Sequence, residues 1–102
     1  MSHIKNNVTL VCYDITSNRL RNKIDKCMKD FGTRIQFSIF ICRLDAVGVQ
    51  RCRVKLMEII EKFACERMQN DSLIIFERLN PGNIDSLIGT KIEYDIPRFM
   101  IL

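Results

Sequence analysis

One run near the start of the sequence limits the fold most strongly. Residues 8–15, VTLVCYDI, are rich in apolar and β-branched side chains, and Asp14 is the only charged residue among them. Such a run predicts a central strand that is covered on both faces. Because side chains alternate along a strand, Asp14 shares a face with Leu10 and Cys12 and emerges where that face meets the edge of the sheet.

An amphipathic helix is predicted directly after this strand. Thr16 and Ser17 offer N-cap hydroxyls, and Gly32 suits a left-handed turn at the end of the helix. The apolar residues between them recur at helical spacing and are Leu20, Ile24, Cys27, Met28 and Phe31. The helix therefore has one apolar face to pack on the sheet.

Strand and helix patterns then continue along the chain. The string TRIQFSIFICRL predicts two short strands at about 34–37 and 39–44, with a turn near Ser38. Asp45 is a good N-cap for a second amphipathic helix, and residues 73–79 predict another strand. The order strand, helix, strand, strand, helix, strand indicates an α+β ferredoxin-like sandwich, an antiparallel sheet with two helices on one face.

The C-terminal segment adds one element to this count. The chain has 102 residues, 47% of them hydrophobic, which suits a single domain over 1–102 with its core at about 8–79. Within the tail at 84–102, KIEYDI at 91–96 alternates strictly and predicts a fifth strand. This strand either folds back on its own sheet or is exchanged with a second subunit, which would also cover the apolar end FMIL.

Cysteine usage and hydropathy exclude several classes of protein. The five cysteines are odd in number and form no Cys-x-x-Cys pair, and His3 is the single histidine, which argues against a disulfide framework and a zinc site. Most of the cysteines are expected to be buried in a reducing compartment. No stretch approaches the roughly 18 apolar residues of a membrane helix, so we expect a cytoplasmic protein without a membrane partner.

The basic residues are unevenly distributed. The formal net charge is +4, and residues 19–29 hold five basic residues against one acid. Arg51, Arg53 and Lys55 form a second group. Solvated helix faces explain such runs as well as contact with nucleic acid does, so the charge alone leaves both interpretations open.

Asp14 has a structural and a functional interpretation. A carboxylate at the end of a buried strand must be paired, hydrogen-bonded, metal-bound or at the solvent rim. It could cap the following helix or pair with Arg19 or Arg21. Alternatively, it binds Mg²⁺, which commonly takes one or two protein carboxylates, and a two-fold dimer would supply a second copy of Asp14.

A shared ion would point to one class of chemistry. Ringed by Arg21, Lys23 and Arg34, it could polarise a phosphodiester and help to generate hydroxide from bound water. Among the sequence motifs, no histidine-based or glycine-rich phosphate site competes with this metal-dependent nuclease chemistry.

Four strings together resemble a known family. They are YDIT at the end of the first strand, LRNK in the first helix, GTRIQFSIFICRL and DSLIIFERL. In this order, over about residues 8–79, they resemble the small CRISPR-associated endoribonuclease family Cas-two, the smaller of the two core proteins of spacer acquisition. The set is highly specific, although no single string would be.

The resemblance implies a ferredoxin-like protomer in a homodimer that is closed partly by exchange of C-terminal strands. It also implies a Mg²⁺ ion, with Mn²⁺ as the alternative, shared by one aspartate from each subunit. Asp14 matches that aspartate, and Tyr13 matches the aromatic residue before it. Phe40 matches a supporting phenylalanine in the step Ser-hydrophobic-Phe.

The resemblance also assigns the nucleic-acid contacts. Arg21 and Lys23 fall on basic positions of the first helix, and Arg34 falls on the arginine before the next strand. The chain departs from the family at Phe37, where a tyrosine is common, and at Ile41, where a glutamate often stands. These departures remove a hydroxyl and a carboxylate and put catalytic strength in doubt. Core packing is the expected role of Phe37 and Phe40.

Two functions follow from the resemblance. In the first, the protein is a Mg²⁺-dependent endonuclease that cuts single-stranded RNA or double-stranded DNA in spacer acquisition and antiviral defence. In the second, the dimer is a non-catalytic scaffold that bridges dimers of the larger integrase subunit and binds spacer-precursor DNA. A stand-alone toxin-type ribonuclease of similar fold is a third alternative.

Overall fold

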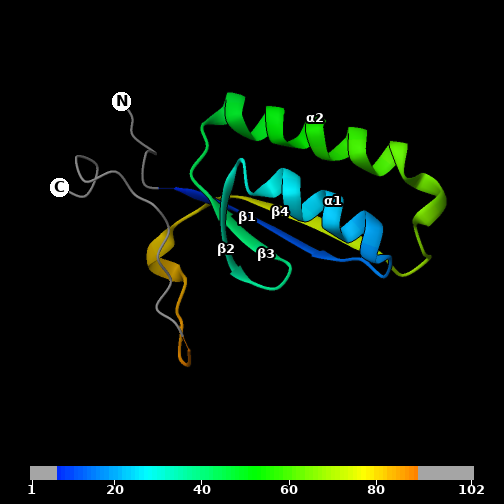
Figure 1. Cartoon of the computed structure of the whole chain (residues 1–102). Coiled ribbons are helices and arrows are strands. Elements are labelled where there is room, and N and C mark those ends of the chain that lie inside the picture. The colour runs from blue at the N-terminus through cyan, green and yellow to red at the C-terminus, as the bar shows by residue number, and fades with distance from the viewer. Residues whose placement is uncertain (1–6, 90–102) are drawn as a thin grey trace.

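The computed structural model describes residues 7–89, which form one antiparallel sheet with both long helices on the same face (Figure 1). The elements are β1 (Val8–Asp14), α1 (Asn18–Met28), β2 (Gly32–Gln36), β3 (Ile39–Cys42), α2 (Ala46–Lys62), the 3-10 turn η2 (Ala64–Glu66), β4 (Ser72–Leu79) and the 3-10 turn η3 (Pro81–Asn83). The strand order is β2-β3-β1-β4, so β1 is central as predicted. The α+β ferredoxin-like fold is confirmed.

Side-chain caps start both helices where the sequence predicts them. The Ser17 hydroxyl accepts a hydrogen bond from the Leu20 N–H at 3.1 Å. Asp45 accepts one from the Gly48 N–H at 2.7 Å. Each cap satisfies a backbone donor that the first helical turn leaves without a partner.

The end of α1 differs from the expectation. The helix ends at Met28. Gly32 is instead the first residue of β2, and its backbone is not left-handed. The reason for glycine is steric. A Cβ atom at Gly32 would lie 2.4 Å from the Ile41 carbonyl oxygen and 2.6 Å from Cys42 Sγ. Gly32 therefore permits the close pairing of β2 with β3 rather than a helix cap.

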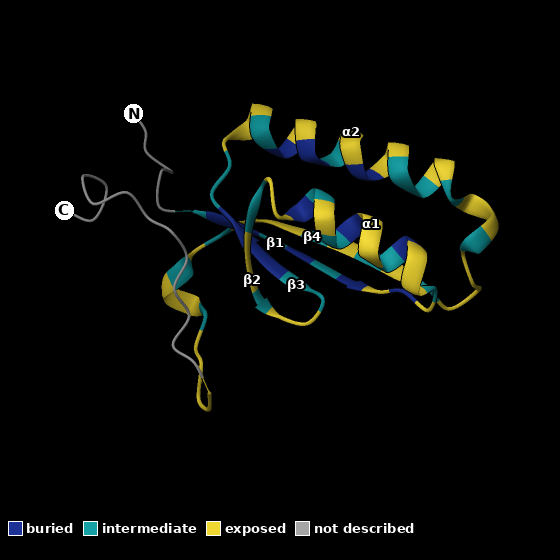
Figure 2. Cartoon of the chain, in the orientation of Figure 1, coloured by how far each residue is buried: buried dark blue, intermediate teal, exposed yellow. Residues whose placement is uncertain are grey.

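The core lies between the sheet and the two helices, whose inner faces are buried (Figure 2). Its fully buried members come from all these elements and include Val11, Leu20, Ile24, Met28, Phe40, Cys42, Cys52 and Leu56. All five cysteines are free, and burial raises the pKa of Cys42 to about 12 and that of Cys52 to about 11. Cys65 is exposed, while the other four are buried or half-buried, as expected of most.

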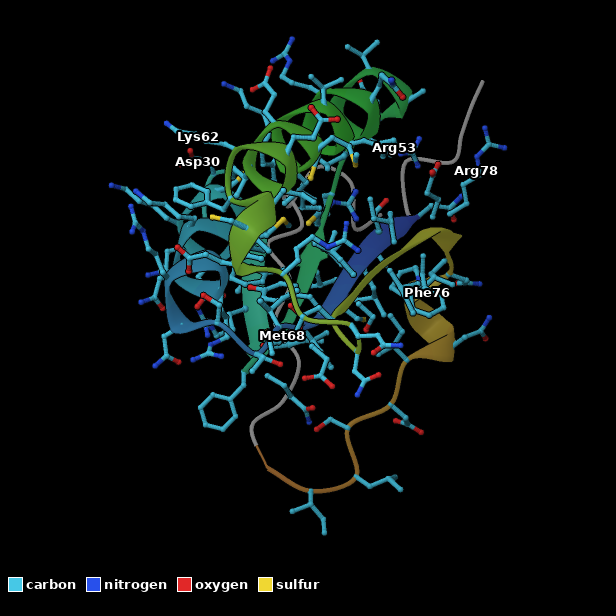
Figure 3. The ribbon with its side chains drawn as sticks, turned by 90° about the vertical axis from the view of Figure 1, so that its right-hand side faces the viewer. Asp30, Arg53, Lys62, Met68, Phe76 and Arg78 are labelled. Atoms are coloured by element: carbon cyan, nitrogen blue, oxygen red, sulfur yellow. The ribbon has the colours of Figure 1, made fainter. Side chains whose placement is uncertain are left out.

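The opposite face of the sheet is apolar and partly open in residues 7–89. On β1, Leu10 and Cys12 are half-buried. On β4, Ile74 and Phe76 pair with these two residues and are 50% and 45% exposed. Figure 3 shows Phe76 on the side of the sheet away from α2. Ile41, which pairs with Leu10 on this face, is fully buried, as is Val8 at the start of β1. The expectation that β1 is covered on both faces is therefore confirmed only in part, because both helices lie on the other face and Leu10 and Cys12 remain half-buried.

A bulge distorts the pairing of β1 with β4. The register shifts between Val8 and Leu10, which pair with Leu79 and Phe76. Arg78 lies in the extra stretch and adopts φ 59°, the left-handed conformation (Figure 3). A β-bulge adds twist to the strand that carries it.

Two further sequence predictions concern the C-terminal strand and the absence of a membrane helix. The fifth strand at 91–96 and its exchange between subunits lie outside the described residues and stay predictions. Within residues 7–89, neither helix is long and apolar enough to cross a membrane.

Candidate metal and nucleic-acid site

Asp14 lies at the end of β1, beside the turn that joins β2 to β3. The Tyr13 N–H donates a hydrogen bond to the Ser38 carbonyl at 3.0 Å, which ties this end of β1 to the turn. On its other side, Asp14 pairs in register with Ser72 of β4. The Asp14 side chain is exposed, on the same face of the sheet as Cys12. The predicted position at the solvent rim is confirmed.

The structural roles considered for Asp14 belong to other residues. Ser17 caps α1, and the Arg19 Nε forms an ion pair with Glu66 at 3.5 Å. Arg21 donates to the Ile15 carbonyl at 2.8 Å and to the side chain of Asn18. Among residues 7–89, Asp14 has no side-chain hydrogen bond or ion pair, so its carboxylate is available to a ligand.

Two acids from the connection between α2 and β4 brace the loop that follows Asp14. Asp71 accepts hydrogen bonds from the Thr16 N–H at 2.9 Å and the Thr16 hydroxyl at 3.0 Å, and from the Met68 N–H at 2.9 Å. The backbone donors of Met68 and Thr16 lower the pKa of Asp71. Glu66 accepts from the Ser17 hydroxyl at 2.6 Å. The sequence did not single out these braces, because they join segments about fifty positions apart.

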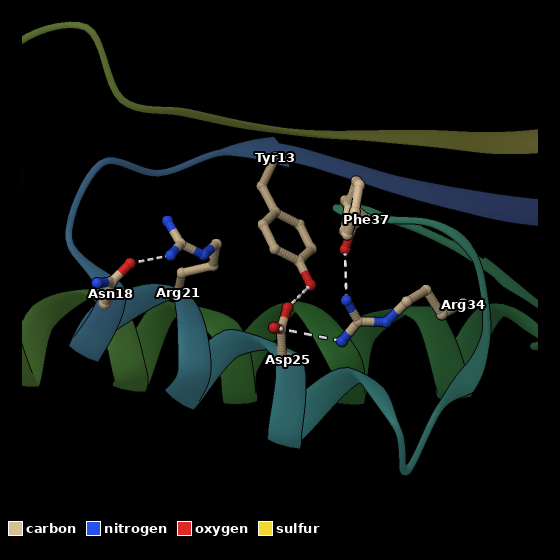
Figure 4. A network of polar contacts seen from close by, with 6 residues as sticks. All are labelled: Tyr13, Asn18, Arg21, Asp25, Arg34 and Phe37. Atoms are coloured by element: carbon tan, nitrogen blue, oxygen red, sulfur yellow. Dashed lines mark hydrogen bonds and ion pairs between the residues drawn. The ribbon is translucent and has the colours of Figure 1, made fainter.

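Tyr13 points to the helix side of the sheet, opposite to Asp14, and forms a polar network there (Figure 4). Its hydroxyl donates a hydrogen bond to Asp25 of α1. The other oxygen of Asp25 forms an ion pair with Arg34 Nη2 at 3.2 Å. Burial raises the pKa of Tyr13, and the hydrogen bond to Asp25 and its negative charge raise it further. Asp25 is the single acid in the basic run of α1 and was not predicted as a site residue.

The same network holds the β2–β3 turn. Arg34 Nη1 donates to the Phe37 carbonyl at 2.6 Å, and the Arg34 Cζ lies 5.1 Å from the centre of the Phe40 ring. The rings of Phe40 and Tyr13 stack with centroids 6.3 Å apart. Core packing of Phe40 is confirmed, because the residue is fully buried. Core packing of Phe37 is wrong: its side chain is 90% exposed, since the two-residue turn leaves it nothing to pack on.

The predicted site residues therefore divide into separate groups. Tyr13, Arg34 and Phe40 lie together on the helix side, and Asp14 lies on the other face. Lys23 is located elsewhere on α1, with its Nζ 5.7 Å from the centre of the Phe63 ring. Within one chain, the structure does not show the predicted ring of three cations around Asp14. Contact of these cations with nucleic acid stays a prediction.

The donor groups of one chain provide only part of a metal site. Within the described residues, there is no group of three or more histidine, cysteine, aspartate or glutamate side chains that could hold a metal ion. Mg²⁺ retains several waters and commonly takes one or two carboxylates. One unpartnered, exposed Asp14 per chain suits half of such a set. Two copies of Asp14 would therefore match the preference of the ion, as the sequence predicts.

Comparison with known proteins supports the resemblance seen in the sequence. The family model described as CRISPR associated protein Cas2 matches residues 7–81. A protein of Moorella thermoacetica named CRISPR-associated endoribonuclease Cas2 1 is 27% identical over 97 residues, covering 86% of this chain and 94% of the relative. A second, CRISPR-associated endoribonuclease Cas2 2 of Thermodesulfovibrio yellowstonii, is 35% identical over 51 residues, with 50% of this chain and 56% of the relative covered.

Other matches are shorter or structural. Cas2 4 of Rhodospirillum rubrum is 45% identical over 31 residues, 30% of this chain and 25% of the relative, so several matches span about half of the relative or less. The structure of hypothetical protein TT1823 from Thermus thermophilus has a TM-score of 0.59 at 22% identity, with 89% and 96% of the two chains covered. A structure described as cas2 has a TM-score of 0.52 at 20% identity, with 83% and 87% covered. These structures support the fold, and the family model, which matches most of the chain, shows that the protein belongs to the CRISPR-associated Cas2 family.

Proposed function

We propose that this protein is a metal-dependent endonuclease that acts in spacer acquisition and antiviral defence as a homodimer. The observation that carries the proposal is Asp14, an exposed carboxylate at a braced strand end with no partner among residues 7–89. Curated relatives are named CRISPR-associated endoribonucleases, which supports the reaction class. The cytoplasm is the proposed location, and single-stranded RNA and double-stranded DNA are the proposed substrates.

The open face of the sheet supports a dimer. Apolar side chains of β1 and β4 lie there, with Ile74 and Phe76 half exposed, and Asp14 lies on the same face at its rim. Burying such a face against a second copy would be favourable by roughly 25 cal/mol for each Å² of apolar surface removed from water. The same contact would provide a second Asp14 for the ion.

Each residue has a defined part in this proposal. Asp14 of each subunit would hold Mg²⁺ or Mn²⁺, and such an ion polarises a phosphodiester and lowers the pKa of bound water. Arg21 and Lys23 would contact phosphates, because neither is neutralised by an acid among the described residues. Arg34 already pairs with Asp25, so a phosphate would compete with that carboxylate for its guanidinium.

A cleavage assay tests the proposal. Purified protein is incubated with labelled single-stranded RNA and double-stranded DNA in Mg²⁺, in Mn²⁺ and in EDTA. Cleavage is expected with either ion and is lost in EDTA or in Asp14→Ala, while sedimentation shows the dimer intact. Asp85→Asn, which removes another exposed acid, is the matched control and should cleave normally. Unchanged cleavage by Asp14→Ala would contradict the proposed metal site.

The scaffold function is the second candidate, and one observation favours it. Where the family often has a glutamate, this chain has Ile41, a hydrocarbon side chain that is fully buried and offers no catalytic group. In this case, the dimer would bridge integrase dimers and bind spacer-precursor DNA through its basic helices, with the C-terminal segment docked on the integrase. Removal of residues 97–102 should then abolish spacer acquisition in cells, whereas Asp14→Ala should not. Normal acquisition by the truncated chain would rule out docking through the tail.

A further inference from the structure

Three cations from two helices converge on one aromatic ring. The Arg19 Cζ lies 5.4 Å, the Lys23 Nζ 5.7 Å and the Lys62 Nζ 5.9 Å from the centre of the Phe63 ring. Since twice 5.9 Å is 11.8 Å, no two of these charges are more than about 12 Å apart. Phe63 is the C-cap residue of α2 and is half-buried against the core. These four residues are called the Phe63 cluster below.

The charge of the Phe63 cluster is only partly neutralised. Arg19 forms an ion pair with Glu66 at 3.5 Å. Within residues 7–89, Lys23 and Lys62 form no ion pair, and both are exposed. The face of the Phe63 ring and the negative end of the α2 dipole favour cations here, but neither removes the repulsion between them. The cluster therefore presents a net positive charge to solvent.

The cavity next to the Phe63 cluster is not expected to bind the anion. Lys62 also lines a cavity of about 380 Å³, whose other charged lining residues are Asp30, Lys55 and Glu58. Neither acid forms an ion pair with Lys62. The mixed charges of the cavity do not favour an anion inside it. An anion would instead contact the cations from solvent, where α1 provides Arg19 and Lys23 and α2 provides Lys62.

The cations lie close enough together to contact one nucleic-acid strand. Phosphates of one strand advance about 3.4 Å along the helix axis, so charges within about 12 Å of one another can face neighbouring phosphates of the same strand. Such contacts position a strand without reading its sequence. Glu66, which pairs with Arg19, also accepts a hydrogen bond from Ser17, so the cluster adjoins the braced loop that follows Asp14.

We propose that Arg19, Lys23 and Lys62, gathered on Phe63, bind the phosphate backbone of a nucleic-acid strand. Arg19, Lys62 and Phe63 would then extend the contact surface from α1 to the end of α2. The inference rests on the proposed nucleic-acid function, but it concerns binding and not cleavage. The phosphate backbone is the ligand, in either RNA or DNA.

Salt dependence of binding tests the cluster. The anisotropy of labelled single-stranded RNA and double-stranded DNA is measured against protein concentration at several salt concentrations. Loss of one phosphate contact reduces the slope of log K against log salt by about 0.7 to 0.9. Lys62→Gln should show this reduction in both the slope and the affinity. A slope equal to that of the wild type would overturn the inference.

Arg78→Gln is the matched control, because it removes one exposed charge from β4, outside both basic helices. The slope of log K against log salt for Arg78→Gln should remain that of the wild type. Equal reductions in Arg78→Gln and Lys62→Gln would indicate general electrostatic attraction and would contradict a localised cluster.

Phe63→Leu tests the role of the ring. Leucine retains apolar packing but has no aromatic face to gather the cations, so the affinity should fall, and Phe63→Tyr should retain it. Circular dichroism and urea unfolding identify any loss of fold. Inorganic phosphate is also added at constant ionic strength. If it displaces the labelled RNA or DNA, the cluster is a site for small anions, and the proposed binding of a strand is wrong.

The two proposals can fail separately. If wild-type protein does not cleave but Lys62→Gln still reduces the salt slope, the nuclease proposal fails and the Phe63 cluster stands. If Asp14→Ala abolishes cleavage but Lys62→Gln binds as the wild type does, the inference fails and the nuclease proposal stands.

Discussion

The hydroxyl of Tyr13 donates a hydrogen bond to Asp25, which links the central strand to α1 on the face of the sheet opposite to Asp14. Asp25 also pairs with Arg34, and Arg34 holds the Phe37 carbonyl in the next turn. One acid thus fixes the strand that presents Asp14 and the turn beside it.

Loss of the Asp25 charge should weaken the fold. Asp25→Asn leaves the Arg34 guanidinium without its acid and replaces the charged acceptor of the Tyr13 hydroxyl by a neutral amide, and hydrogen bonds to charged groups contribute about 1.5 to 3 kcal/mol. We expect the free energy of unfolding, measured in urea, to fall by about 2 kcal/mol. Asp85→Asn, at an exposed acid, should change it by less than about 0.5 kcal/mol. Equal stability of the two variants would contradict the role of Asp25.

The Tyr13 hydrogen bond should make stability depend on pH in the alkaline range. The pKa of Tyr13 is raised above its ordinary value of 10.0 by burial and by Asp25. The folded state therefore retains the proton after the unfolded state has lost it, so this stabilisation is complete below pH 10 and is lost as the pH rises further. Above pH 10, the wild type should lose stability more steeply than Tyr13→Phe. Parallel curves from urea unfolding at each pH would refute this.

Gly32 should tolerate no side chain. Because a Cβ atom would lie 2.4 Å from the Ile41 carbonyl, Gly32→Ala must separate β2 from β3. Overpacking of this kind costs about 1 to 3 kcal/mol, measurable by urea unfolding. Gly82→Ala is the control, because its Cβ atom would lie 3.3 Å from the Asn80 side chain and requires only a small shift. A smaller loss for Gly32→Ala than for Gly82→Ala would contradict the steric explanation.

Replacement of Arg78 by glycine should stabilise the chain. The left-handed conformation at φ 59° destabilises a residue with a Cβ atom by about 1 to 2 kcal/mol, and glycine avoids this strain. The greater entropy of glycine in the unfolded state offsets about 0.5 to 1 kcal/mol of that gain. Arg78→Gly should therefore raise the free energy of unfolding by about 0.5 to 1 kcal/mol. Arg78→Ala retains the strain and should show no gain. A matching gain in Arg78→Ala would assign the effect to the arginine side chain instead.

Local patterns in the sequence determined the elements and their order. The apolar run at 8–15 predicted the central strand, and Ser17 and Asp45 predicted the helix starts, because these signals depend on neighbouring residues. The alternation of β1 also placed Asp14 at the solvent rim on the face of Cys12. The family resemblance came from strings within the same segments.

Contacts between distant segments were decided only by the tertiary structure. From its place in the sequence, Gly32 was expected to cap a helix. Only the close approach of β3 shows why a glycine is needed there. Phe37 and Phe40 are three positions apart in one apolar string, yet a turn exposes the first while the helices bury the second. Asp25 and Lys62 acquire their surroundings when the helices pack on the sheet and on each other. Side-chain periodicity depends on neighbouring residues and can be read from the sequence. A charge network depends on contacts between segments that are distant in the sequence, and these contacts form only in the folded chain.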